Sequence, residues 1–221
     1  MRHGKYIIIE GIDGSGKTTQ LKHLIERLSE RKIPFYKHIE PSEKPVGKFI
    51  RETILSGEYD TNELVRQMLF LTDRLDNFYN GRFALENLLR EGDLIVADRS
   101  FLSGMVYGGE AGLKIHNQLF DYLILPDLII YLDIPPEESI RRIDSGGGNK
   151  EIYETLEQQI EFKKRYESNL RRLEAINGVF VHNIDGTKSE KIIAELIWDI
   201  VWNFISISPD EMREYVSTIG L

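Results

Sequence analysis

Residues 5–19, KYIIIEGIDGSGKTT, are the stretch that most constrains how this chain can fold. An apolar run from Tyr6 to Ile9 stops at Glu10 and gives way to a glycine-rich loop of the pattern GxxxxGK[ST]. Glycines leave no Cβ in the way, so successive backbone N–H groups can turn inward to bind an anion, and the helix that follows adds its positive N-terminal end. The stretch therefore predicts a strand, a phosphate-binding loop and a helix, in that order.

The side chains of this loop predict a site for a nucleotide and magnesium. Lys17 supplies a mobile charge for the β- and γ-phosphates, and the Thr18 hydroxyl is the expected magnesium ligand. A β-branched strand before the loop and an amphipathic helix after it favour this interpretation over a glycine-rich turn without a ligand. The expected nucleotide-binding residues are Gly11, Ile12, Asp13, Gly14, Ser15, Gly16, Lys17, Thr18 and Thr19.

The composition argues against several other functions. The chain has no cysteine, which excludes a disulfide framework, a thiolate zinc site and a cysteine nucleophile. Its five histidines show no metal-ligand spacing, and its formal net charge of −8 disfavours a sequence-independent grip on nucleic acid. We see no signal peptide and no apolar run of membrane length, so we expect a cytoplasmic protein that binds small molecules rather than a membrane or nucleic acid.

Strand-like and helix-like segments alternate along the chain. Apolar runs predict strands at 6–9, 33–39, 94–98, 128–133 and 179–184. Helical spacing predicts helices after the phosphate loop, at 42–57, at 61–91 with a break near 80–81, at 101–123, after Pro135, at 153–176 and at 189–204. This alternation predicts an α/β domain over residues 1–205, with a five-stranded, mostly parallel sheet covered by helices on both faces, and a short tail over 206–221.

Polar residues at the strand ends are the first candidates for catalysis, because ligands of parallel sheets bind at the carboxyl ends of the strands. Asp98 ends the strand LIVAD, where a second carboxylate can hold magnesium through water, and Arg99 would lie at the transferring phosphates. A structural ion pair is the simpler alternative for these two residues. Ser103 and Tyr107 follow Arg99 at i+4 and i+8, so in a helix all three would face one pocket.

A second pair of candidates lies in the predicted helix at 61–91. Phe70 and Arg74 are four residues apart, so a stacking ring and a forked donor would share one face and could read a flat base. On helical spacing alone Phe70 is more simply a core ring, and Arg51, in the helix before, is more simply a solvated charge.

The sequence SGGGN lies within an expected lid of about residues 143–152. Arg141, Arg142 and Lys150 flank these glycines, and a glycine hinge with basic shoulders is typical of a loop that closes over phosphates. A surface loop with solvated charges is the alternative.

As a set, these residues resemble the thymidylate kinase family of P-loop nucleoside monophosphate kinases. Six blocks stand in family order, namely IIIEGIDGSGKTTQ, EPSEKPVGKFIRE, QMLFLTDRLDN, DLIVADRSFLSGMVY, PDLIIYLDIPPEESIRR and IDGTKS. Many NTPases share the phosphate loop, whereas Glu-Gly-x-Asp, Leu-Phe-x-x-Asp-Arg and Asp-Arg-x-x-x-Ser are more specific. The resemblance implies a P-loop NTPase-type fold, MgATP as donor and dTMP as acceptor. It also implies dTDP and ADP as products, in a step toward dTTP, and a homodimer joined through helices.

The resemblance also implies roles around the acceptor base and sugar. Phe70 looks like the ring that stacks on thymine, and Arg74 looks like the donor to the base edge. Ser103 and Tyr107 look like walls of the same pocket, with Tyr107 placed to exclude a 2′-hydroxyl.

Around the acceptor phosphate, Arg51 and Arg99 look like the clamp, and Asp13 looks like the carboxylate near the sugar hydroxyl and that clamp. Two blocks depart from the family here. Residues 40–43 read EPSE instead of the usual Glu-Pro-Gly-Gly, so this loop could have another shape. Residues 98–100 read DRS instead of Asp-Arg-Tyr, which removes an aromatic ring near the site.

The third departure concerns a catalytic arginine, which the family places either in the phosphate loop or in the lid. Here the loop position is Gly14, and residues 143–152 contain no arginine. Our hypothesis is that Arg142 takes this role, with Arg141 or Lys150 as the other candidates.

Two other functions stay open on the sequence. The first is a kinase of another deoxynucleotide or of a deoxynucleoside, although a nucleoside would bring no 5′-phosphate for Arg51 and Arg99 to clamp. The second is a catalytically weak, nucleotide-binding regulatory protein that uses residues 206–221 for a partner. The arginine-poor lid favours that function, and intact Lys17 and Thr18 argue against it.

Overall fold

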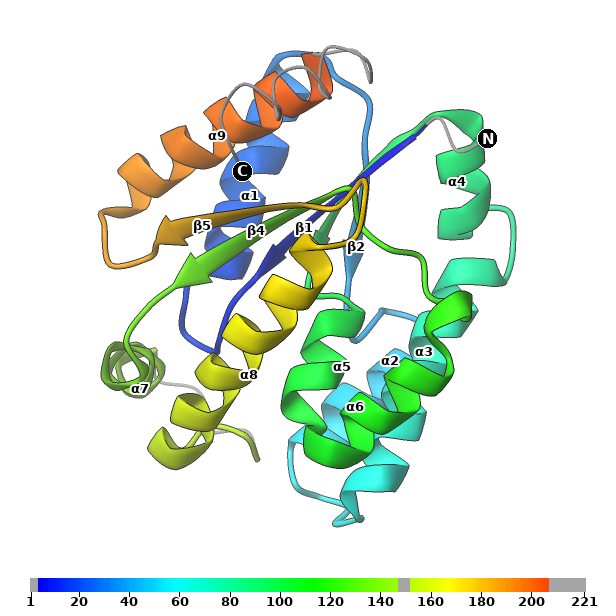
Figure 1. Cartoon of the computed structure of the whole chain (residues 1–221), viewed down its shortest axis with the longest axis vertical. Helices are drawn as coiled ribbons and strands as arrows, with labels where there is room; N and C mark the ends of the chain where they lie inside the picture. The colour runs from blue at the N-terminus through cyan, green and yellow to red at the C-terminus, as the bar shows by residue number, and fades with distance from the viewer. Residues whose placement is uncertain (1–3, 147–151, 207–221) are drawn as a thin grey trace.

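The computed structural model describes residues 4–146 and 152–206, which form a parallel sheet with helices on both faces (Figure 1). Within these residues five strands follow the order β2-β3-β1-β4-β5, and all neighbouring pairs are parallel. The predicted α/β fold with a five-stranded parallel sheet is confirmed. The strands are β1 (Lys5–Glu10), β2 (Tyr36–Ile39), β3 (Leu94–Asp98), β4 (Leu128–Asp133) and β5 (Phe180–Asp185).

The helices cover both faces of the sheet, which explains why the strands read as continuous apolar runs. They are α1 (Lys17–Glu30), α2 (Pro45–Phe49), the π-helical turn η1 (Ile50–Leu55), α3 (Glu63–Tyr79), α4 (Leu85–Glu91), α5 (Phe101–Tyr107), α6 (Gly109–Gln118), the 3₁₀ turn η2 (Phe120–Tyr122), α7 (Pro136–Ser145), α8 (Leu156–Glu174) and α9 (Glu190–Ser206). In β1, Tyr6 and Ile8 pack with α3, α5, α6 and α8, whereas Ile7 and Ile9 pack with α1 and α9 on the other face (Figure 1).

Most predicted elements are present, and the differences have local causes. The long segment 61–91 divides into α3 and α4 near the predicted break, and 101–123 divides into α5, α6 and η2. The second strand begins at Tyr36 rather than at Ile33, because the Ile33 N–H closes the end of α1 on the carbonyl of Leu28. Helix α8 begins at Leu156 rather than at residue 153, because Thr155 caps it through its side chain.

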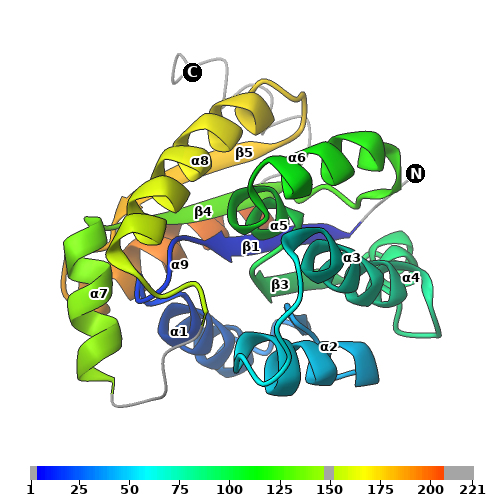
Figure 2. The same ribbon diagram turned by 90° about the horizontal axis from the view of Figure 1, so that it is seen from below.

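The carboxyl ends of the strands carry the loops of interest. Figure 2 shows α7 at this edge, beside the loop between β1 and α1, and the Ser139 hydroxyl of α7 donates to the carbonyl of Asp13 at 2.7 Å. Lys150 and the tail from residue 207 onward lie outside the described residues, so the lid over 143–152 and the domain limit at 205 stay predictions. No helix in the described part of the chain is long and apolar enough to cross a membrane.

Candidate active site

The loop between β1 and α1 has the geometry of a phosphate-binding loop. Gly11, Gly14 and Gly16 have φ angles of 154°, 69° and 96°, which residues with a side chain rarely adopt. Gly16 is the N-cap of α1, so the loop opens onto the N-terminus of that helix. The Lys17 ammonium donates to the carbonyl of Ile12 at 2.8 Å and therefore lies over the loop. Burial and the nearby Arg99 lower the pKa of Lys17 to about 8.

Thr18 and Asp98, the predicted magnesium ligands, lie together. The Thr18 hydroxyl donates to Asp98 Oδ2 at 2.6 Å, and the other carboxylate oxygen, Oδ1, is buried without a hydrogen-bond partner. Such an oxygen donor set fits Mg²⁺, which binds proteins through one or two oxygen ligands and keeps several waters. Across residues 4–146 and 152–206 we find no cluster of three or more metal-ligating side chains, so phosphates and water would complete the coordination.

Arg99, directly after β3, connects the phosphate loop to a second site. Its guanidinium pairs with Asp13 of the loop, donates to the Ser103 hydroxyl at 3.2 Å and lies 4.9 Å from the centre of the Tyr107 ring. Arg99, Ser103 and Tyr107 therefore line one pocket, although Arg99 itself lies before α5 and outside the helical conformation. Burial would raise the pKa of Asp13, but the charges of Arg99 and Lys17 hold it below its usual value.

Glu10 is a buried carboxylate to which the sequence reasoning gave no specific role. It ends β1 and accepts hydrogen bonds from the hydroxyls of Ser100, Ser103 and Tyr166 at 2.9, 2.9 and 2.8 Å. Burial raises the pKa of Glu10, although the Arg99 charge and these hydroxyls oppose the shift. Ser100 stands at the position of the family's aromatic ring. Its hydroxyl donates to Glu10 and also caps the N-terminus of α5. The sequence signal for this buried site is a carboxylate at the end of an otherwise apolar strand.

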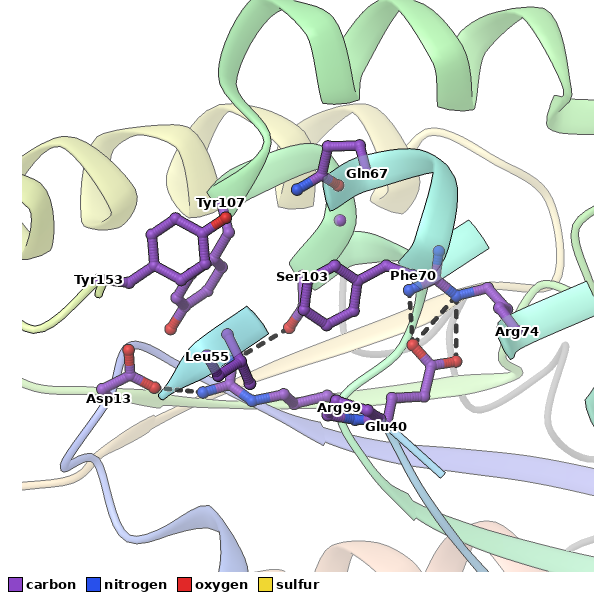
Figure 3. A pocket seen from close by; sticks show the side chains of 12 residues that line it. Asp13, Glu40, Leu55, Gln67, Phe70, Arg74, Arg99, Ser103, Tyr107 and Tyr153 are labelled. Carbon is purple, nitrogen blue, oxygen red and sulfur yellow. Dashed lines mark hydrogen bonds and ion pairs between the residues drawn. The ribbon is translucent and has the colours of Figure 1, made fainter. Parts of the chain in front are cut away.

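A pocket opens beside the phosphate loop, between α3, α5 and the segment that precedes α8 (Figure 3). It is lined by Asp13, Glu40, Pro41, Leu55, Gln67, Phe70, Arg74, Arg99, Ser103, Gly104, Tyr107 and Tyr153. Six of the seven predicted substrate-binding residues belong to this lining. The exception is Arg51. Its guanidinium donates to the Pro41 carbonyl and, at 3.2 Å, to Glu43, both in the loop after β2.

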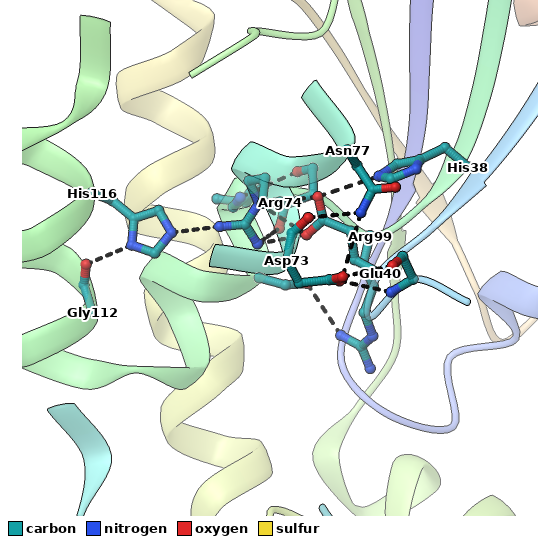
Figure 4. Close-up of polar contacts among 12 residues, drawn as sticks. His38, Glu40, Asp73, Arg74, Asn77, Arg99, Gly112 and His116 are labelled. Atoms are coloured by element: carbon teal, nitrogen blue, oxygen red, sulfur yellow. Dashed lines mark hydrogen bonds and ion pairs between the residues drawn. The ribbon is translucent and has the colours of Figure 1, made fainter. Parts of the chain in front are cut away.

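Arg74 is only 1% exposed and lies in a buried network (Figure 4). Its guanidinium donates to the Glu40 carboxylate at 2.5–3.0 Å, to the Ser100 carbonyl at 3.1 Å and to the His116 ring at 2.7 Å. Burial would raise the pKa of Glu40, but Arg74 and His38 overcome it and lower that pKa to about 2. No local spacing connects Arg74 with Glu40 or His116, so the sequence reasoning predicted neither of these contacts.

The loop that reads EPSE is held in place by a carboxylate of α3. Asp73 accepts hydrogen bonds from the backbone N–H and the hydroxyl of Ser42, at 2.7 and 2.6 Å, and it is buried. Gly47 packs so closely on the same residue that a Cβ there would lie 2.1 Å from the Ser42 carbonyl oxygen. Ser42 therefore replaces the family glycine with a side chain that fastens the loop.

The three lid candidates have different positions. Arg142, on α7, donates to the carbonyl of Gly186 at 2.9 Å and to that of Gly14 at 3.4 Å, so it bridges the phosphate loop and the turn after β5. Both arginines pair with Glu138 of their own helix, but the Arg141 side chain is exposed and makes no contact with either loop among the described residues. Lys150 is not among the described residues.

These features define a P-loop nucleotide-binding protein with a second pocket, lined by aromatic and arginine side chains, next to its phosphate loop. A family profile described as thymidylate kinase matches residues 9–197. The chain belongs to the thymidylate kinase family.

Individual relatives agree with this assignment. The chain is 31% identical to the thymidylate kinase of Carboxydothermus hydrogenoformans, over 89% of this chain and 95% of the relative. It is 34% identical to the probable thymidylate kinase of Methanococcus aeolicus, over 87% and 94% of the two chains. In fold it resembles the thymidylate kinase of Candida albicans, with a TM-score of 0.72 at 23% identity over 92% of this chain and 93% of the other.

The Asp73–Ser42 contact gives a first prediction. Asp73→Ala should lower the free energy of unfolding by about 2–3 kcal/mol, because it removes two buried hydrogen bonds to a charged group. Asp76→Ala is the matched control on the same helix, since Asp76 also contacts this loop, through Lys44 at 2.9 Å, but in a partly exposed ion pair. That control should cost less than about 1 kcal/mol. Urea unfolding measures both, and equal losses would contradict the assigned role of Asp73.

Proposed function

We propose that this chain transfers the terminal phosphoryl group of MgATP to dTMP, giving ADP and dTDP. The observation that carries the proposal is the ion pair between Asp13 and Arg99, because Asp13 belongs to the phosphate loop and Arg99 to the wall of the second pocket. A donor on the loop and an acceptor in the pocket would bring their phosphates together at this pair. The similarity to proteins named thymidylate kinase supports the same reaction.

On the donor side, the backbone N–H groups from Gly11 to Thr19 and the N-terminus of α1 would bind the β- and γ-phosphates. Lys17 would leave the Ile12 carbonyl and place its charge on the transferring oxygens. Thr18 and Asp98 would hold Mg²⁺, which supplies positive charge at the β- and γ-phosphates when bound.

On the acceptor side, Phe70 would stack on thymine and Arg74 would donate to the edge of the base. The Tyr107 ring stacks on Phe162 with 4.3 Å between centroids and also contacts the Arg99 guanidinium. Tyr107 is therefore a rigid wall, which suits the exclusion of a 2′-hydroxyl from the sugar site.

The chemistry needs positioning and charge stabilisation rather than a nucleophile from the protein. The acceptor phosphate is already an oxyanion, so no general base is required. Arg99 and Arg51 would hold it in line with the γ-phosphate, and Ser103 keeps Arg99 oriented by accepting from its Nη1 at 3.2 Å. Closure of the lid over residues 143–152 would exclude water from the reaction.

The alternatives fit these contacts less well. A deoxynucleoside kinase would leave Arg99 and Arg51 without an acceptor phosphate. A regulatory protein without turnover would not need the Thr18–Asp98 oxygen pair beside Lys17. The expected cytoplasmic location stays a prediction.

The acceptor preference is the direct test. In an ADP-release assay with MgATP, dTMP should turn over at least about tenfold more efficiently, as kcat/KM, than dUMP, dCMP, AMP or thymidine, because only dTMP offers thymine, a deoxyribose and a 5′-phosphate together. Lys17→Ala, which removes the charge over the phosphate loop, should abolish most of this turnover. A preference for thymidine over dTMP would contradict the proposal.

We further propose that Arg142 supplies the charge of the missing arginine, because its guanidinium already contacts the loop at Gly14, the position where other members carry an arginine. Arg142→Ala should lower kcat by about tenfold or more while KM for ATP changes less than about threefold, since the interaction forms mainly in the transition state. Arg141→Ala is the neighbouring control and should stay near wild type. A rise in KM for ATP without a loss of kcat would instead assign Arg142 to donor binding.

A homodimer is the proposed assembly, and an apolar surface on α2 and α3 supports it. Phe49, Leu64, Val65 and Met68 are 40–53% exposed there, on helices that contact each other.

Met68→Glu should therefore shift the protein toward monomers, because burying an unpaired carboxylate in an apolar interface is costly. Ile192→Glu is the control, since Ile192 is comparably exposed on α9, far along the chain from this surface. Sedimentation velocity measures the mass of each variant. A dimer that tolerates Met68→Glu, or that is broken only by Ile192→Glu, would place the interface elsewhere.

A further inference from the structure

His116 is a fully buried histidine for which the proposed reaction gives no role. It lies near the end of α6, on the opposite side of Arg74 from Glu40 (Figure 4). Its Nδ1 is 2.7 Å from the carbonyl oxygen of Gly112, and its Nε2 is 2.7 Å from Nη1 of Arg74. A carbonyl can only accept and a guanidinium can only donate, so Nδ1 carries the hydrogen and Nε2 is the acceptor.

The remaining contacts of Arg74 leave one N–H group unused. Its Nε and one hydrogen of Nη2 point to Glu40, the other hydrogen of Nη2 points to the Ser100 carbonyl, and one hydrogen of Nη1 points to His116. The second hydrogen of Nη1 has no hydrogen-bond partner among the described residues. Nη1 itself lies next to Gly104, where an added Cβ would be 3.3 Å from this nitrogen, and both Gly104 and Arg74 line the pocket.

We propose that His116 is a positioning residue for acceptor recognition. By accepting one hydrogen of Arg74 Nη1, His116 keeps the other hydrogen directed at the pocket. There this second hydrogen selects an acceptor base that has a carbonyl oxygen, rather than an amino group, at the edge facing Arg74. This inference rests on the proposed role of Arg74 in binding the acceptor base.

Two further observations fit this role. Burial and the neighbouring Arg74 lower the pKa of His116 to about 4, so the ring stays neutral and remains an acceptor near neutral pH. The ring also occupies space that only glycine leaves open, because a Cβ on Gly104 would lie 2.5 Å from its Nε2. The glycine in α5 therefore leaves the space that the His116 ring occupies next to the pocket.

Two amide variants separate positioning from simple core packing. The Oε1 of His116→Gln can reach the place of Nε2 and accept from Arg74. His116→Asn can replace only Nδ1, so it keeps the bond to Gly112 and loses the acceptor. Ile115→Ala is the matched control, because it removes buried apolar volume from the same turn of α6 without removing an acceptor of Arg74.

The experiment compares steady-state kinetics with dTMP and dCMP at saturating MgATP. His116→Asn should raise KM for dTMP about tenfold, leave kcat within about threefold and reduce the preference for dTMP over dCMP about tenfold. His116→Gln should stay within about threefold of wild type in each value, and Ile115→Ala should lower the melting temperature without changing the preference. Should His116→Asn not fold, as seen by circular dichroism, His116→Leu takes its place with the same expected result.

The inference is overturned if the Asn variant keeps the wild-type preference, or if the Gln variant and Ile115→Ala lose as much of it as the Asn variant does. Arg74→Met tests the underlying site separately. An unchanged KM for dTMP in Arg74→Met would sink the proposed acceptor site itself. A large effect of Arg74→Met with none of His116→Asn would sink only the role of His116. Adding His116→Asn to Arg74→Met should have no further effect on the preference if the two residues act as one unit.

Discussion

The partly buried charge of Arg99 is the interaction on which the rest of the site depends. A guanidinium that is mostly removed from water needs ion pairs and hydrogen bonds, and Arg99 has them in Asp13, Ser103 and the face of Tyr107. Its φ angle of 71° is one that a non-glycine residue adopts only where its surroundings demand it, at a cost of about 1–3 kcal/mol. Glu10 accepts hydrogen bonds from the hydroxyls of Ser100 at the N-cap of α5, Ser103 in α5 and Tyr166 in α8. Arg99 and Glu10 together therefore connect β1, β3, α5 and α8 with the phosphate loop.

Helix α3 connects this centre to the outer surface of the molecule. Gln67, Phe70 and Arg74 follow each other at i, i+3 and i+7, so they share the face that lines the pocket. Leu64 and Met68 lie on the exposed part of the same helix. A partner that packs on the outer surface would therefore restrict the motion of α3, which carries the base-binding candidates. Assembly could in this way affect the acceptor pocket.

The sequence predicted those features that depend on short-range spacing. The phosphate loop, the order of strands and helices, and the common pocket of Arg99, Ser103 and Tyr107 all follow from patterns a few residues long. The partners that complete the site do not, because Arg74 meets Glu40 and His116 across 34 and 42 residues. The sequence shows Ser42 as a departure from the family loop. Its hydrogen bonds to Asp73 depend on how α3 packs, and no local sequence pattern predicts that packing.

The absence of an arginine from the phosphate loop has a steric basis in the packing of α7. A Cβ on Gly14 would lie 2.7 Å from the carbonyl oxygen of Ser139, and the φ angle of 69° is itself unfavourable for a side chain. The Ser139 hydroxyl fixes this contact by donating to the Asp13 carbonyl. Arg142 lies one turn further along α7, so the packing that leaves no room for a loop arginine also brings a helix arginine to the Gly14 carbonyl. The loop and α7 therefore have to be considered as one unit, and the proposed role of Arg142 would place a charge from α7 at the position where the loop has Gly14.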